Sequence, residues 1–306
     1  MLDIPMKQPK VCILLSTFNG ERYLMEQLQS IYEQDYPHIQ IRVRDDGSHD
    51  KTVQLLENEQ KKGKLTWYKG ENKGAAWSFW DLLMQAPDCD YYAFADQDDF
   101  WKPEKISTAI RSLEKTDTDQ CALYFGQTQL ADKQLKPISS IILQPKLTYG
   151  EALIVQFVGG CTMVFNHALR KQLQTYTPTH LFMHDFWIYN VALALDAKVV
   201  FDPTPHILYR QHGNNVIGQA NSTLFIWRSR LKRLWENKHI RTKTAQDLWD
   251  GYHAKMSPRN RQITLWASNC NKSLLATWHL LTSSDYRTFS RKSDWFARIS
   301  VLLRIF

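Results

Sequence analysis

Short apolar runs alternate with amphipathic stretches through the first 115 residues of this 306-residue chain. Between the runs, apolar residues recur at helical spacing, as Leu24, Leu28 and Ile31 do. Strands that alternate with helices are typical of a parallel sheet covered on both faces, so we predict an α/β fold with a mostly parallel central sheet. The four predicted strands are Val11–Leu15, Ile39–Val43, Leu65–Tyr68 and Tyr91–Ala95.

The second half of the chain is less regular. Helical patterns cover His167–Leu173 and Ile188–Leu195, and a Gly pair at 159–160 precedes an apolar, strand-like run. We predict one domain over residues 1–220 and a helical region over residues 221–306. Further strands are predicted at Cys121–Phe125, Lys198–Phe201 and His206–Tyr209.

Polar or acidic side chains follow each of the four strands in the first half. In an open parallel sheet, ligands bind just beyond the carboxyl ends of the strands, so these residues predict a nucleotide site. The chain contains neither a Gly-x-Gly-x-x-Gly nor a Walker loop, which argues against a dehydrogenase or a P-loop ATPase. The residues at these ends are Ser16, Thr17, Asp45, Asp46, Asn72, Gly74, Asp96 and Asp98.

Three carboxylates crowd together directly after the fourth strand, at Asp96, Asp98 and Asp99. Such groups raise one another's pKa unless a cation or hydrogen-bond donors neutralise them. Asp96 and Asp98 supply the hard oxygen ligands that Mg²⁺ or Mn²⁺ prefers. The alternative is a solvated turn followed by a helix cap, and we expect Asp99 to be the cap of the helix that begins near Pro103.

Composition limits the class of protein. The 43% of hydrophobic residues suffice for a core. Five widely spaced cysteines without a Cys-x-x-Cys pair indicate neither a disulfide framework nor a zinc site. The N-terminus lacks signal-peptide features, and no apolar run reaches the roughly 18 residues that span a bilayer. We therefore expect a cytoplasmic globular protein.

Charge is distributed unevenly along the chain. Residues 221–306 hold 16 Lys and Arg against 5 Asp and Glu, whereas residues 1–220 have a net charge of −4. Residues 222–235 and 295–306 combine aromatic and aliphatic residues with Arg and Lys, the pattern of a helix at a membrane interface. The alternative is a helical cap on the catalytic domain with a solvated basic face.

Five motifs in this order and at these intervals resemble the family 2 glycosyltransferases with the GT-A fold, a Rossmann-like α/β architecture. The segments Phe94–Pro103 and Tyr209–Gly218 look most like the bacterial rhamnosyltransferase branch of cell-wall and capsular polysaccharide synthesis. The family's acidic pair appears here as His184-Asp185, so only the second acid is carried over. The motifs are Ser16–Gly20, Asp45–Ser48, Asn72–Gly74, Asp96–Asp99 and His184–Asp185.

The resemblance implies a role for each motif. Asp185 would be the catalytic base, Asp98 would hold Mn²⁺ or Mg²⁺ together with His212, and Asp46 would bind the pyrimidine ring. A single base without a nucleophile implies inversion of the anomeric carbon. The implied nucleotide and donor residues are Ser16, Thr17, Asn19, Asp45, Asp46, Asn72, Gly74, Asp96 and Gln97. The implied acceptor-side residues are Gly159, Gly160, His184 and Trp187.

The resemblance further implies transfer of a sugar, most plausibly from dTDP-L-rhamnose, to a lipid-linked glycan at the inner face of the plasma membrane. The Gln-x-x-Arg-Trp motif and transmembrane bundle of processive synthases are missing, which favours addition of one or a few sugars. A UDP-hexose donor is the first alternative, and a sugar-phosphate nucleotidyltransferase is a more distant one. An inactive membrane scaffold or a nucleic-acid-binding protein acting through the basic tail is another alternative, although the acidic strand ends argue against nucleic acid.

Overall fold

The computed structural model of the chain describes residues 8–117, 119–138, 142–211 and 238–306. It contains two compact units whose segments interleave along the sequence. The boundary predicted at residue 220, His212 and the helix predicted over residues 222–235 all lie outside the described residues. The first unit comprises Met1–Ser140, Gly159–Lys171 and Val200–Arg210, and the second comprises Ile141–Val158, Gln172–Val199 and Gln211–Phe306.

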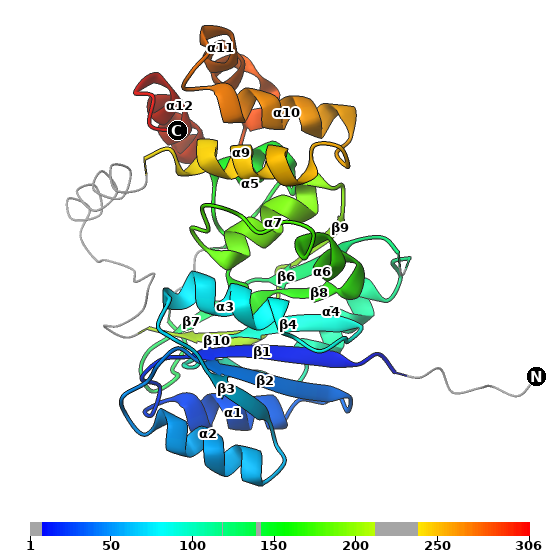
Figure 1. Cartoon of the computed structure of the whole chain (residues 1–306), viewed down its shortest axis with the longest axis vertical. Coiled ribbons are helices and arrows are strands. Elements are labelled where there is room, and N and C mark those ends of the chain that lie inside the picture. The colour runs from blue at the N-terminus through cyan, green and yellow to red at the C-terminus, as the bar shows by residue number, and fades with distance from the viewer. Residues whose placement is uncertain (1–7, 118, 139–141, 212–237) are drawn as a thin grey trace, which may run out of the picture. The chain divides into compact units, whose positions relative to one another are not determined.

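A seven-stranded sheet organises the first unit, in the order β3-β2-β1-β4-β8-β6-β9 (Figure 1). Neighbouring strands among β1 to β4 are parallel, whereas β8 is antiparallel to both β4 and β6. The predicted α/β fold with a mostly parallel sheet is therefore confirmed. The strands are β1 Val11–Thr17, β2 Ile39–Asp45, β3 Thr66–Lys69, β4 Tyr91–Ala95, β6 Ala122–Gly126, β8 Val164–Asn166 and β9 Lys198–Asp202.

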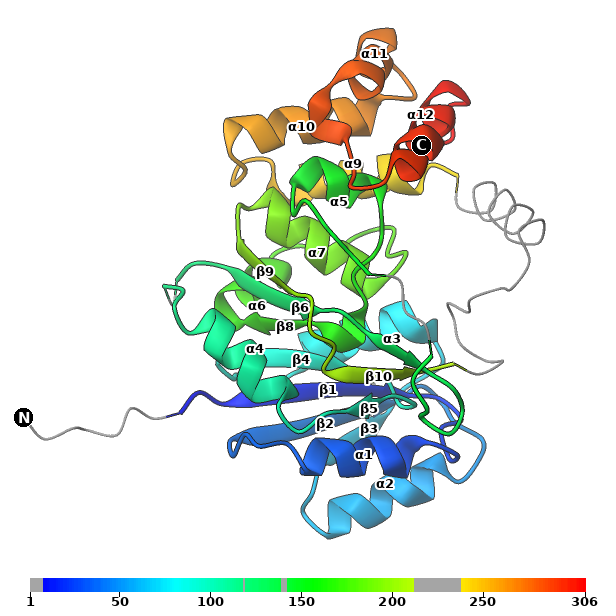
Figure 2. The same ribbon diagram turned by 180° about the vertical axis from the view of Figure 1, so that it is seen from behind.

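Helices cover both faces of this sheet because β1 is apolar on both faces. Val11, Ile13 and Leu15 join one core cluster with α1, α2 and α4. On the other face, Phe79 of α3 packs edge-on against Phe94 of β4, with ring centroids 5.4 Å apart. Figure 2 shows the sheet from the side of α4. The helices are α1 Leu24–Tyr32, α2 Thr52–Lys61, α3 Gly74–Met84, α4 Lys105–Leu113 and α6 His167–Leu173.

The strand register brings the predicted site residues to one edge of the sheet. Thr17 pairs with Asp45, and Leu15 pairs with Ala95, so β1, β2 and β4 end at the same level. A second, three-stranded sheet contains β5 Phe100–Trp101, β10 Ile207–Arg210 and β7 Gln129–Ala131.

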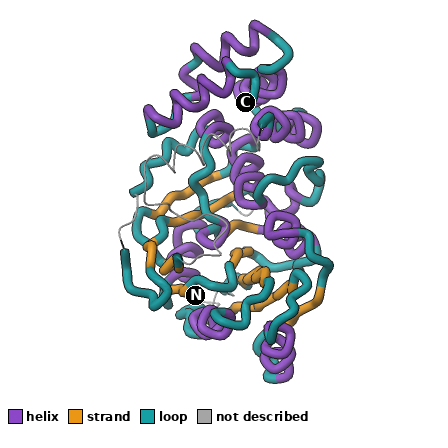
Figure 3. The backbone as a smooth tube through the Cα atoms, turned by 90° about the vertical axis from the view of Figure 1, so that its left-hand side faces the viewer, coloured by secondary structure: helices purple, strands orange, loops and turns teal. Residues whose placement is uncertain are grey.

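The second unit is mainly helical (Figure 3). Helix α10 caps α7, because Asn260 Nδ2 donates to the terminal carbonyl groups of Leu193 (3.0 Å) and Ala194 (3.2 Å). The predicted helical C-terminal region is confirmed, and no helix of the described chain is long and apolar enough to cross a bilayer. The helices are α5 Tyr149–Ile154, α7 His184–Ala194, α9 Ile240–Tyr252, α10 Pro258–Asn269, α11 Leu274–Thr282 and α12 Arg291–Leu302.

We expect Gly150→Ala to lower the free energy of unfolding by roughly 2–3 kcal/mol. A Cβ atom at Gly150, in α5, would overlap the backbone carbonyl of Asp285 and lie 2.8 Å from its carbon atom. Gly159→Ala is the control, because a Cβ atom there would meet only the Cys161 sulfur, at 3.8 Å. Urea unfolding measures both, and equal effects would contradict the close packing of α5 against Asp285.

Candidate active site

Gln97 ties the loop after β4 to the loop after β1. Its Oε1 atom accepts hydrogen bonds from the Thr17 hydroxyl and from the Phe18 N–H (2.9 Å), and its Nε2 atom donates to the Phe18 carbonyl (3.1 Å). Thr17 is buried, so this linkage is shielded from solvent on the Thr17 side. Thr17 and Gln97 are both predicted to line the nucleotide site, and the structure brings them together.

Asn19 ties the loop after β1 to the loop after β2. It adopts a left-handed conformation (φ 48°), which Asn tolerates better than most residues. Its N–H donates to the Ser48 hydroxyl (2.8 Å), and its side-chain oxygen accepts from the His49 N–H (2.9 Å). The three loops therefore form one hydrogen-bonded set.

Asp45 closes the turn that follows β2. Its fully buried carboxylate accepts hydrogen bonds from the backbone N–H groups of Gly47 (3.2 Å) and Ser48 (3.0 Å), and also from the Ser48 hydroxyl. Gly47 has a φ of 87°, which favours glycine. These contacts support a structural role for Asp45 in holding the turn.

Asp46 joins β2 to the start of α3. Its buried carboxylate pairs with Arg44 and accepts from the backbone N–H groups of Lys73 and Gly74, the latter at 3.0 Å. A carboxylate at a helix N-terminus is stabilised by the unpaired N–H groups there. Asn72 contributes a further bond, because its Oδ1 atom accepts from Gly74 N–H (3.3 Å).

Arg44 is a site residue that the sequence reasoning missed. Its buried guanidinium also donates to Asp81 (2.9 Å) and to the Ser78 hydroxyl (2.9 Å), which in turn contacts the Ser16 hydroxyl at 2.6 Å. The available signal was an Arg directly before the Asp45-Asp46 pair, at a strand end that is otherwise acidic.

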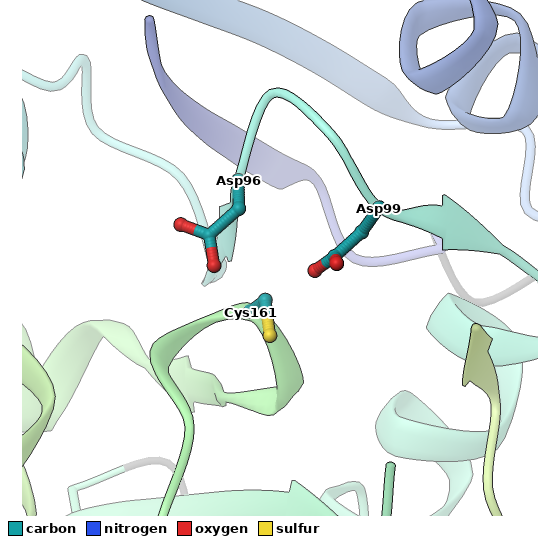
Figure 4. Close-up of side chains that lie close together, drawn as sticks. All are labelled: Asp96, Asp99 and Cys161. Carbon is teal, nitrogen blue, oxygen red and sulfur yellow. The ribbon is translucent and has the colours of Figure 1, made fainter. Parts of the chain in front are cut away.

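The acids after β4 separate into two environments. Ligand atoms of Asp96, Asp99 and Cys161 lie within 4.8 Å of one another (Figure 4), whereas Asp98 is not in this group. Asp96 and Asp98 are partly exposed, but Asp99 is only 1% exposed. The prediction that Asp99 caps α4 is wrong, because strand β5 intervenes and Glu104 is the N-cap residue.

The partly exposed Asp96 and Asp98 fit a divalent cation better than the buried Asp99 and Cys161 do. Mg²⁺ keeps several water ligands and Mg²⁺ and Mn²⁺ prefer oxygen, whereas Asp99 is sealed from water and Cys161 offers sulfur. Burial also raises the pKa of the Cys161 thiol well above its usual range. Asp96 and Asp98 are therefore the residues here whose donor atoms suit a hard metal.

Lys105 is a second buried titratable group that interacts electrostatically with Asp99. Neither carboxylate oxygen of Asp99 nor the Lys105 ammonium has a hydrogen-bond partner within the described part of the chain. Lys105 Nζ lies 3.7 Å from the ring centroid of Trp101. Burial lowers the pKa of Lys105 to about 7, while the charges of Cys161 and Asp99 oppose that shift.

Gly159 and Gly160 lie in the first unit, beside this cluster in sequence. Gly160 begins a 3-10 turn, Gly160–Thr162, that carries Cys161. The Thr162 hydroxyl and N–H both donate to the Gly159 carbonyl, at 2.7 and 2.9 Å. These two bonds close the turn onto the Gly159 carbonyl. A Cβ atom at Gly159 would make only an ordinary contact with the Cys161 sulfur, at 3.8 Å.

Asp185, His184 and Trp187 lie in the second unit, in the first turn of α7. The Asp185 Oδ1 atom accepts from the Phe186 N–H (2.7 Å) and from Gln156 Nε2 (3.1 Å), which orient the carboxylate. Trp187 packs against the rings of Tyr176 and Tyr252, which also contact each other. This packing makes Trp187 part of the core of the second unit.

These features describe an α/β protein with a polar ligand edge at the carboxyl ends of its strands. Residues 12–193 match the family model described as glycosyl transferase family 2. The dTDP-rhamnosyl transferase RfbG of Shigella flexneri is 30% identical over 261 residues, covering 77% of this chain and 85% of the relative. The putative teichuronic acid biosynthesis glycosyltransferase TuaG of Bacillus subtilis (strain 168) is 29% identical over 170 residues, covering 55% and 66%.

Solved structures share the fold at low sequence identity. The crystal structure of S. aureus TarS 1–349 has a TM-score of 0.58 and 16% identity, covering 97% of this chain and 81% of that chain. The mannosyltransferase PcManGT from Pyrobaculum calidifontis, in complex with GDP-Man and Mn²⁺, has a TM-score of 0.53 and 17% identity, covering 98% and 88%. The chain belongs to glycosyl transferase family 2 and is an enzyme of glycosyl transfer, as its resemblance predicted.

Asp99→Asn and Lys105→Met should be coupled in a double-mutant cycle. If each buried group stabilises the charged form of the other, either single change removes that interaction and should lower the free energy of unfolding by roughly 1–3 kcal/mol. The double variant should lose clearly less than the two losses added together. Urea unfolding at pH 7 measures all four proteins. Additivity within about 0.5 kcal/mol would contradict the coupling, and the exposed Arg259–Asp285 pair provides a control with little coupling expected.

His184 should make the protein less stable as pH falls. Burial lowers the pKa of His184 to about 3, against about 6.5 in the unfolded chain. Between these values the unfolded chain binds the extra proton, so the free energy of unfolding decreases with decreasing pH. Between pH 6.5 and 4.5 we expect His184→Gln to lose roughly 2–3 kcal/mol less than the wild type does. Parallel pH profiles from urea titrations would exclude this role for His184.

Proposed function

We propose that this enzyme transfers L-rhamnose from dTDP-L-rhamnose to a lipid-linked glycan in cell-surface polysaccharide synthesis, with inversion at the anomeric carbon. The observation that carries the proposal is the hydrogen-bonded edge formed by the loops after β1, β2 and β4, in which Asp96 and Asp98 flank Gln97. The choice of rhamnose is supported by the 30% identity to the dTDP-rhamnosyl transferase RfbG. Polysaccharide synthesis is supported by that relative and by TuaG.

The edge offers groups that suit a nucleoside diphosphate sugar. The proposal assigns Asp46 to the imide N–H of the pyrimidine, because a carboxylate accepts that donor well. Asp46 already accepts bonds from Arg44 and the start of α3, which hold its carboxylate in one orientation. Thr17 and Gln97 form the neighbouring wall, and Gly20 permits this because a Cβ atom there would lie 2.7 Å from the Thr17 hydroxyl.

Asp98, together with Asp96, is the proposed ligand set for Mn²⁺ or Mg²⁺. When bound, the cation would supply positive charge beside the diphosphate leaving group. Asp96 and Asp98 are partly exposed and offer the oxygen ligands that these ions prefer. PcManGT, a protein with the same fold, was solved with Mn²⁺ and GDP-Man.

Asp185 is the proposed general base. An acceptor hydroxyl becomes nucleophilic when a carboxylate takes its proton as the new C–O bond forms. The Phe186 N–H and the Gln156 amide donate to one oxygen of Asp185, and its position in the first turn of α7 favours the ionised form. With one base and direct attack, the sugar departs from its nucleotide in a single inverting step.

A UDP-hexose is the second candidate donor. TarS, which shares the fold, was solved in complex with UDP-GlcNAc, with a TM-score of 0.56 over 95% of this chain. We propose for either donor that the enzyme works at the inner face of the plasma membrane, where a lipid-carried acceptor is accessible.

The donor is tested by measuring nucleotide release from dTDP-L-rhamnose, UDP-glucose, UDP-galactose and UDP-GlcNAc, each with Mn²⁺, with Mg²⁺ and with EDTA. We expect release from dTDP-L-rhamnose to exceed the others by roughly tenfold or more, since a site built around one sugar discriminates by several kcal/mol. Preferential release from a UDP-sugar would show that the donor is a UDP-sugar and not dTDP-L-rhamnose. Undiminished release in EDTA would contradict the proposed requirement for Mn²⁺ or Mg²⁺. Release from none of them would overturn the proposed function.

Asp185→Asn should lower kcat by roughly 10²–10⁴-fold while leaving nucleotide binding unchanged, because it removes the base but keeps the shape of the side chain. The matched control is Asp196→Asn, just beyond the opposite end of α7, where the left-handed backbone (φ 53°) suits Asn as well as Asp. Calorimetry with dTDP checks binding. Equal kcat values for the two variants would remove Asp185 from the chemistry.

A further inference from the structure

The last two helices of the chain expose their large apolar side chains. Seven of the eleven large apolar residues exposed within the described ranges lie between residues 274 and 303. Helices α11 and α12 pack on one another (Figures 1 and 2). We call the exposed positions the α11–α12 surface, which comprises Leu274, Leu275, Trp278, Trp295, Ile299, Leu302 and Leu303.

Helix α12 reverses the usual distribution of large and small residues, and α11 exposes Trp278 although it buries Leu280. Trp278 is 63% exposed and Trp295 is 66% exposed, whereas the buried positions of α12 are Ala297, Ser300 and Val301. A helix that packs only for stability buries its largest apolar residues. Large apolar side chains that are exposed on two packed helices are typical of an interaction surface.

The surface also carries positive charge that no ion pair among the described residues neutralises. Lys272, Arg291, Lys292 and Arg304 are exposed, and none of them forms an ion pair with another described residue. Arg291 and Lys292 occupy the first turn of α12, where the helix dipole disfavours cations. Their position therefore has no helix-stabilising explanation.

The nearby acids are engaged elsewhere. Asp285 pairs with Arg259 at 2.6 Å. Asp294 accepts hydrogen bonds from the N–H (2.7 Å) and hydroxyl (2.8 Å) of Thr288. The cations around the exposed Leu and Trp side chains are left to interact with an external anion.

We propose that the α11–α12 surface docks the enzyme on an anionic lipid bilayer. Trp and Leu side chains enter the boundary between headgroups and acyl chains, and Lys and Arg contact anionic headgroups, the combination typical of interfacial helices. A second copy of this chain fits less well. In a two-fold interface the same four cations would face one another, and charged residues, Lys in particular, are depleted at the cores of protein interfaces. Docking goes beyond the proposed glycosyl transfer and does not depend on which donor is used.

The test is co-sedimentation of the full chain with vesicles of phosphatidylcholine alone or of phosphatidylcholine mixed with anionic phosphatidylglycerol. Wild type should bind the anionic vesicles and bind neutral ones roughly 100-fold more weakly, because all four cations then lose their attraction to headgroups. Trp278→Glu with Leu302→Glu should reduce binding roughly 100-fold, because both insertion and charge attraction are weakened. Arg291→Gln with Lys292→Gln should reduce binding to anionic vesicles roughly tenfold and binding to neutral vesicles little.

Two matched controls separate this surface from general charge and hydrophobicity. Ile142→Glu alters an exposed apolar residue elsewhere in the second unit, and Lys61→Gln with Lys115→Gln removes two exposed cations from the first unit. Both should bind like wild type, and circular dichroism checks that every variant is folded.

Three outcomes would overturn the proposal. The first is that wild type does not sediment with either vesicle. The second is that Trp278→Glu with Leu302→Glu binds as wild type does, which would transfer membrane binding to another part of the chain. The third is that sedimentation velocity without lipid shows a wild-type dimer that this double variant dissolves, which would assign the surface to a second copy. Nucleotide release, measured on the same proteins, reports separately on the proposed function.

Discussion

A single buried guanidinium connects most of the polar edge of the first unit. Arg44 binds the carboxylates of Asp46 and Asp81 and donates to the backbone carbonyl of Glu71 (3.0 Å), so it links β2, α3 and the loop between β3 and α3. Burying a cation is unfavourable unless it is paired and fully hydrogen-bonded, and these partners meet that requirement. The loop passes so closely that a Cβ atom at Gly70 would lie 2.8 Å from Arg44 Nε.

Some parts of the fold could be predicted from the sequence, and others could not. Apolar runs of five residues and helical periodicity predict β1, β2, β4 and the helices between them, because those features follow from burial alone. Strand β8 runs antiparallel and contains only Val164–Asn166, so its local pattern carries no information about its direction or neighbours. The interleaving of the two units depends on contacts between distant segments, which periodicity does not reveal.

The candidate site divides in the same way. Residues at the strand ends were predictable because parallel strands bring their carboxyl ends to one edge. The separate environments of Asp98 and Asp99 were not predictable, since adjacent residues in a loop can point to solvent or to the core. Asp99 is buried near Cys161, which belongs to a turn more than 60 residues further along the chain. Asp99 also interacts electrostatically with Lys105. Sequence spacing alone cannot identify such partners.

The chain segments that make up the second unit limit how this fold could change during evolution. Helices α5 and α7 come from the middle of the chain, yet their contacts are with the C-terminal helices: Arg241 of α9 donates to the last carbonyl group of α5 (2.9 Å), and Asn260 of α10 caps α7. The C-terminal helices therefore cannot be exchanged between related enzymes as a simple terminal module. A functional exchange would have to carry residues 141–158 and 172–199 with it, so the proposed base Asp185 would be inherited together with the C-terminal helices rather than with the nucleotide edge.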